Sequence, residues 1–138
     1  SESSIEALEH AIGLAARTDA RLTLAYSVEP RILVEGDAAP SVPESDDRLY
    51  TEGLSDAEDR GERILDDAVE RAREAGVEAE AELLYGDPVE TIPEFVAAEG
   101  VDAVYVGHRG LSERAEGLVG SVAESLVERV TVPVTVVR

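Results

Sequence analysis

Short apolar segments alternate with amphipathic segments along this 138-residue chain, and the alternation limits the folds it can adopt. Residues 22–28, 77–85, 103–107 and 132–137 carry the apolar runs or the two-residue alternation of strands. Residues 4–18, 55–75, 88–99 and 121–130 carry apolar side chains at helical spacing. This order predicts an α/β fold, in which helices cover both faces of a mostly parallel sheet. The length predicts one domain over residues 1–138.

One long segment interrupts the alternation. Residues 30–54 combine three prolines and many acids with few apolar side chains, so we expect a lid or a loop there. Ser55 and Glu58 have the spacing of a capping box, which predicts that the next helix begins at Ser55. Gly76 is well placed to end that helix.

Asp87 and Pro88 predict the N-cap and the first residue of the following helix. Pro93 lies five residues later, where its ring and its missing N–H disfavour a helix interior. We therefore expect either an irregular first turn or a regular helix that begins only after Thr91.

The chain is strongly acidic. It carries 31 Asp and Glu against 12 cationic residues, all of them Arg, for a net charge of -19. Such self-repulsion destabilises a compact fold at low salt, whereas in molar salt the Debye length is only about 3 Å. The composition is halophile-like and predicts a high-salt cytoplasm, the alternative being an ordinary acidic protein. It also argues against binding nucleic acid, which requires a basic face.

Several classes of protein are excluded by what the sequence lacks. Without Cys there is no disulfide and no thiolate chemistry. Without Lys there is no Walker A loop, which requires G-K-[ST]. No apolar run approaches the roughly 20 residues of a membrane span, and no signal peptide opens the chain. We expect a soluble cytoplasmic protein with no membrane partner.

A glycine pattern follows the predicted strand at residues 103–107. Gly107 and Gly110 are followed, after nine further residues, by Gly120 and Ser121 at the start of the predicted helix 121–130. Glycine allows the backbone to approach a ligand closely, and a helix N-terminus offers unpaired N–H groups to an anion. The pattern predicts a phosphate-binding turn, although Gly107 could instead serve only a tight turn and Ser121 only a helix cap.

Two side chains inside the glycine turn are candidates for ligand contact. The guanidinium of Arg109 could pair with a phosphate or point into solvent, and Arg114 is a weaker candidate of the same kind. His108 could act as a general base only with a suitable partner, which the sequence does not show. For His108 we favour a loop contact over catalysis.

These residues resemble the ATP-binding branch of the universal stress proteins, whose motif is G-x2-G-x9-G-[ST]. The spacing of Gly107, Gly110, Gly120 and Ser121 matches it, and the apolar segments on either side are also similar. The resemblance implies an open five-strand sheet of order 3-2-1-4-5. Residues 1–4 would follow its first, central strand, which the given sequence lacks and which would end in an Asp that contacts adenine.

The resemblance also implies the site. Ser27 and Val28, at the end of the second family strand, would meet the adenine through backbone groups, unless they are ordinary strand-end residues. Gly107 would face the ribose, while the N–H groups of Gly120, Ser121 and Val122 would hold the phosphates. The implied ligand is ATP, or AMP or ADP, with Mg²⁺ as a candidate companion.

The function implied is a nucleotide-binding module for stress response, regulatory or protective, that forms a homodimer through residues 132–137. The alternative for this strand is that only its own helices cover it. Turnover would be slow at most, because the sequence shows no positioned base. Two other functions stay open: a slow adenosine-nucleotide hydrolase, and a protein-interaction module whose site holds no nucleotide.

Overall fold

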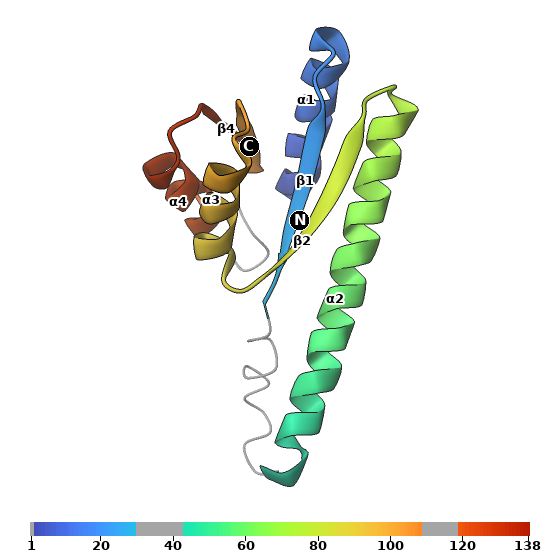
Figure 1. Ribbon diagram of the computed structural model, residues 1–138, viewed down its shortest axis with the longest axis vertical. Helices are drawn as coiled ribbons and strands as arrows, with labels where there is room; N and C mark the ends of the chain where they lie inside the picture. Colours follow the sequence, from blue (N-terminus) through green and yellow to red (C-terminus); the bar gives the residue numbers. More distant parts are fainter. Residues whose placement is uncertain (1, 30–42, 109–118) are drawn as a thin grey trace.

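The computed structural model describes residues 2–29, 43–108 and 119–138, in which helices and strands alternate as predicted (Figure 1). The elements are α1 (Glu2–Thr18), β1 (Leu22–Val28), α2 (Pro43–Glu74), β2 (Ala79–Tyr85), α3 (Pro88–Glu99), β3 (Val104–Gly107), α4 (Ser121–Arg129) and β4 (Val134–Val137). Within these ranges, none of the helices combines the length and the apolar character needed to cross a bilayer.

The strands form two parallel pairs. β1 pairs with β2, from Leu22 opposite Ala79 to Val28 opposite Tyr85. β3 pairs with β4 in the same way, and the N–H of Val104 also donates to the carbonyl of Pro133, 2.9 Å away, just before β4. Parallel pairing confirms one part of the expected fold, but the described residues form two separate two-stranded sheets and do not show the five-strand order.

Helices cover the strand pairs from two sides. α2 packs along β1 and β2, and α1 packs against β3 and β4, whereas α3 and α4 pack against each other (Figure 1). The core between α1 and α2 is made of small and branched side chains, namely Ile12, Ala15, Ala72 and Val77. This division of the helices between two faces fits the predicted α/β architecture.

The face of α1 that is turned toward the protein consists of small residues. Ser3, Ala7, Ala11 and Ala15 recur at four-residue intervals and are all buried. Side chains with this spacing lie on one face of a helix. Because they are short, the axis of α1 can approach the strands closely, and its first turn reaches the end of β3.

The predicted start of α2 was wrong. The helix begins at Pro43, so residues 55–58 lie inside it and residues 43–54 are helical, while residues 30–42 lie outside the described ranges. The capping pattern does not mark the end of a helix, because Ala57, which lies inside the pattern, is already on the buried face of α2. Ala57, Gly61 and Leu65 follow one another at four-residue intervals, and a Cβ on Gly61 would lie 2.8 Å from the ring of Tyr26.

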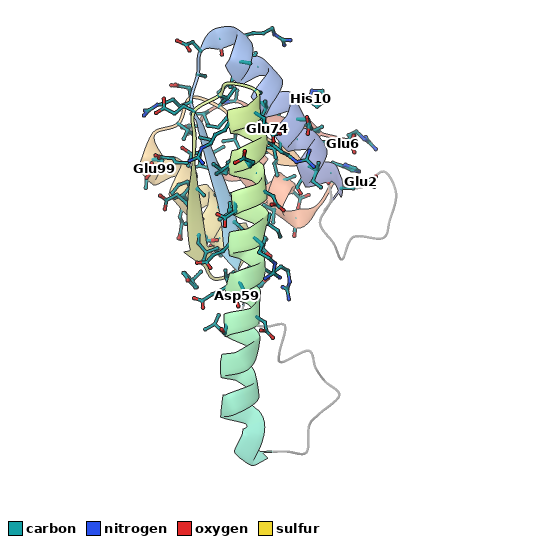
Figure 2. The ribbon with its side chains drawn as sticks, turned by 90° about the vertical axis from the view of Figure 1, so that its right-hand side faces the viewer. Glu2, Glu6, His10, Asp59, Glu74 and Glu99 are labelled. Atoms are coloured by element: carbon teal, nitrogen blue, oxygen red, sulfur yellow. The ribbon has the colours of Figure 1, made fainter. Side chains whose placement is uncertain are left out.

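The upstream part of α2 extends past the strands that it covers (Figures 1 and 2). Its 32 residues make a helix of about 48 Å at 1.5 Å per residue. The seven residues of β1 span only about 23 Å. The downstream half of α2 therefore carries the packing on the sheet.

The expected irregularity at Pro93 was also wrong, because α3 runs without interruption from Pro88 to Glu99. Asp87 caps its N-terminus, and Gly100 ends it with a φ of 69°. Pro93 has no N–H for the carbonyl of Val89, four residues earlier. Two side chains of α4 replace that donor: Ser125 Oγ lies 2.8 Å and Arg129 Nη1 lies 3.1 Å from the Val89 oxygen.

This replacement predicts a coupling between Ser125 and Pro93. Ser125→Ala should lower the free energy of unfolding by about 1 kcal/mol, the usual net value of one hydrogen bond. In a Pro93→Ala background the loss should be smaller, because the N–H of the new alanine can donate to Val89. Urea unfolding of the two single variants and the double variant in molar KCl gives the coupling energy. Equal losses in both backgrounds would contradict this account of the helix.

Candidate functional site

Gly107, the last residue of β3, is buried against the first turn of α1. A Cβ built on it would lie 2.6 Å from both the carbonyl carbon and the Oγ of Ser3. The close approach of α1 is thus sufficient reason for a glycine here, whether or not a ligand also requires it. The sequence reasoning missed Ser3, although the four-residue spacing of small residues on α1 carried a signal for it.

The backbone of His108 joins three elements. Its N–H donates to the carbonyl of Val137 at 2.9 Å, and its carbonyl accepts from the N–H of Gly120 at 2.6 Å. These bonds fix the residue after β3 to the end of β4 and to the start of α4. Gly107, His108 and Gly120, three of the predicted site residues, therefore lie together.

The side chain of His108 is only 9% exposed. Its Nδ1 atom is buried and has no hydrogen-bond partner among the described residues. Burying a polar atom without a partner costs about 1–3 kcal/mol, so such atoms are rare in folded proteins.

The N-cap residue of α4 carries no side chain. It is Gly120, with φ of -70° and ψ of 162°, and it makes no side-chain bond to the amides of the first turn. Ser121 is the first helical residue and is exposed, so the alternative in which it caps the helix was wrong. The amides of a first helical turn, here those of Ser121 and Val122, have no partner within the helix. They lie at the positive end of its dipole, where anions bind.

Ser27 and Val28 end β1, as predicted, and both are linked to the turn that leads into α3. The Val28 carbonyl accepts from the N–H of Gly86 at 2.8 Å. Ser27 Oγ donates to the carbonyl of Gly86 at 2.8 Å and lies 2.8 Å from the hydroxyl of Thr91. The Ser27 hydroxyl therefore positions the β2–α3 turn. An adenine contact through the backbone of these residues remains a prediction.

The orientation of α1 relates the two parts of the predicted site. α1 begins beside Gly107, at the carboxyl end of β3, and its last turns pack near Leu22, at the amino end of β1. The two strand pairs consequently point the same way, and their carboxyl ends face one edge of the molecule. Ligands of open α/β sheets bind at such an edge. Arg109, Gly110 and Arg114 lie outside the described residues.

Other chemistry at this edge is limited. Over residues 2–29, 43–108 and 119–138, no three acidic or His side chains are grouped so as to hold a metal ion. The pKa of Tyr85, which ends β2, lies above its ordinary value of 10.0, because its hydroxyl donates to Glu58 and nearby carboxylates repel the phenolate. Tyr85 therefore stays protonated at neutral pH and is a poor candidate for a base.

Parallel strand pairs with helices on two sides define a protein of the α/β class. The family model of the universal stress proteins matches residues 1–138. The chain belongs to this family. Universal stress protein YxiE of Bacillus subtilis is 30% identical over 138 residues, which cover all of this chain and 93% of that protein. Universal stress protein MJ0531 of Methanocaldococcus jannaschii is 32% identical over 141 residues, which cover 100% of this chain and 76% of that protein.

Solved structures agree on the fold. The universal stress protein UspA of Lactobacillus plantarum superposes with a TM-score of 0.82 at 23% identity, covering all of this chain and 91% of the other. A universal stress protein in complex with cAMP superposes with a TM-score of 0.66 at 28% sequence identity, covering 100% of this chain and 89% of the other. A universal stress protein from Archaeoglobus fulgidus in complex with dAMP superposes with a TM-score of 0.62 at 21% sequence identity, covering 100% of this chain and 90% of the other.

Alanine should have opposite effects on the free energy of unfolding at Gly107, which is crowded by Ser3, and at Gly13, which has open space around it. Gly107→Ala should destabilise the protein by about 1–3 kcal/mol, because the added Cβ overlaps backbone atoms of α1. Gly13→Ala, in the middle of α1 with nothing within 4 Å of the new Cβ, should stabilise it by about 0.5–1 kcal/mol. Urea unfolding in molar KCl measures both. A Gly107→Ala variant as stable as the wild type would refute the close packing of α1.

Proposed function

We propose that this protein binds an adenine nucleotide at the edge where the carboxyl ends of β1 and β3 lie. The observation that carries the proposal is the start of α4. There the N-cap of α4 is a glycine, which brings no side chain to the first-turn amides, and its nitrogen lies 2.6 Å from the carbonyl oxygen of His108, directly beyond the end of a parallel strand. The relatives in complex with cAMP and dAMP support an adenine nucleotide as the class of ligand.

The residues divide between the two ends of the ligand. Backbone groups of Ser27 and Val28 meet the base, and Gly107, His108, Arg109 and Gly110 surround the ribose and phosphates. The N–H groups of Ser121 and Val122 hold the phosphates, whereas the N–H of Gly120, which was also expected to do so, already donates to the carbonyl of His108. Binding through amides suits a chain with no Lys and a net charge of -19, since the donors are fixed in place by the fold.

ATP is the first candidate, with ADP and AMP as alternatives. If Mg²⁺ accompanies the nucleotide, its phosphates would supply the main ligands, given the lack of a metal-binding group in the described part of the chain. We propose a regulatory or protective role in the stress response of a cytoplasm rich in salt. Hydrolysis, if it occurs, is slow, because the described site shows no paired general base.

We also propose the five-strand order 3-2-1-4-5 for the complete sheet, with a further strand between β1 and β3. Among the described residues each of these strands pairs on one edge only. α1 packs against the β3–β4 pair, and the C-terminal turns of α1 reach the amino end of β1. α1 therefore spans the place where the further strand would lie. The whole chain would then form one domain.

Calorimetric titration in molar KCl tests the nucleotide site. The wild type should bind ATP, and Gly120→Val should weaken binding about tenfold or more, because the branched side chain obstructs the amides of the first turn. Gly13→Ala is the matched control and should bind normally. Phosphate release should stay well below roughly 1 s⁻¹, an ordinary enzymatic rate.

The result of the titration separates the three functions. Absence of binding in the wild type would favour the interaction module that holds no nucleotide. Release above that rate, lost in Gly120→Val, would favour the hydrolase.

Sedimentation tests the homodimer that we propose through residues 132–137. The dimer fraction should increase from low salt to molar KCl, because salt screens the repulsion between two chains of charge -19. Thr135→Asp, on an exposed position of β4, should lower the dimer fraction, whereas Thr131→Asp, exposed before the strand, should not. A monomer at all salt concentrations would rule out this contact.

A further inference from the structure

The imidazole of His108 is the buried polar group that the described structure leaves without a function. It is 9% exposed, and its Nδ1 atom has no partner among the described residues. The backbone that carries the ring is fixed, because the N–H of His108 is bonded to Val137 and its carbonyl to Gly120. A buried polar atom without a partner is the arrangement expected where a ligand completes the hydrogen bond.

The direction of the side chain follows from its neighbour. Gly107 faces α1, since its Cβ would meet Ser3. Successive side chains of a strand point to opposite faces, and the N–H of His108 continues the pairing of β3 with β4 by donating to Val137, so the side chain of His108 is directed away from α1. Figure 1 shows α3 and α4 together on the side of β4 away from α1, and the carbonyl of His108 accepts the N–H of the α4 N-cap. The imidazole thus lies next to the N-terminus of α4.

We propose that Nδ1 of His108 donates a hydrogen bond to a phosphate oxygen of the bound nucleotide. The inference rests on the proposed nucleotide site and adds to it the side chain that recognises the phosphate. A neutral imidazole with its proton on Nδ1 has one N–H donor. A phosphate oxygen offers only acceptors, and the first-turn amides of α4 place it beside this donor.

The small number of His residues allows the signal of His108 to be assigned without ambiguity. The chain has two His residues, and the other one, His10, lies exposed on the outer side of α1 (Figure 2). A nitrogen resonance that changes with the ligand can therefore be assigned by replacing one His at a time. His10→Asn serves as the matched control.

The experiment is titration of adenosine, AMP and ADP in molar KCl. His108→Leu should weaken AMP and ADP binding by about tenfold or more, as expected for a lost hydrogen bond to a charged group, and leave adenosine unchanged. His108→Asn keeps an amide near the position of Nδ1 and should restore AMP binding to within a few fold. In the wild type, the Nδ1 resonance of His108 should shift with AMP but not with adenosine, and that of His10 should not move.

The possible failures are distinguishable. If the wild type binds no adenine nucleotide, the proposed function fails. If it binds AMP while His108→Leu binds equally well and the Nδ1 resonance stays fixed, only the role of His108 is overturned. An equal loss of adenosine binding would also overturn it, by showing that the side chain supports the site as a whole. Should His108→Leu not fold, the resonance of the wild type decides.

Discussion

The rest of the structure depends on the packing of α1 across two strand pairs that do not pair with each other. Its small residues lie against β3, and its last turns share a core with α2 and the start of β1. The contact of Ser3 with Gly107 sets how near the helix can come. With longer side chains on that face, α1 would stand away from β3, and the ends of the strands would no longer share one edge.

For an acidic chain to bind an anion, local attraction at the site must exceed the long-range repulsion from the net charge of the protein. The net charge of -19 repels a nucleotide at long range, but that repulsion is screened by salt. Amides at a helix start act within hydrogen-bond distance and are screened much less. The proposed site, built from the amides of Ser121 and Val122, can therefore operate in a protein with no Lys, provided that salt is abundant.

Much of the fold follows from local patterns. The strand at residues 22–28 was predicted with its observed bounds, and Asp87, Pro88 and Gly100 have the roles at the ends of α3 that their chemistry predicts. The failures have a common cause, which is packing between distant segments. Ser55 does not begin a helix because Ala57 and Gly61 beyond it lie on one buried face of α2, and α3 tolerates Pro93 because α4 supplies the missing donors.

The candidate site could be predicted only as a list of residues. Spacing predicted Gly107, Gly120 and Ser121 as site residues, but no pattern showed that the backbone of His108 is bonded to β4 and to the start of α4, or that His108 is buried. Both properties arise from where β4 and α4 come to lie. The glycine spacing is local information, whereas the burial of one side chain depends on the whole fold.

The hydrogen bonds that α4 donates to α3 are part of a longer chain of contacts between the ends of β1 and β3. Ser27 of β1 is bonded to Thr91 of α3, Val89 of α3 to Ser125 of α4, and Gly120, the cap of α4, to His108 beyond β3. These bonds join the two strand ends through a continuous path on the face opposite α1. A displacement at the front of α4 would therefore pull on α3 and on the end of β1, so these bonds mechanically link the two parts of the proposed site.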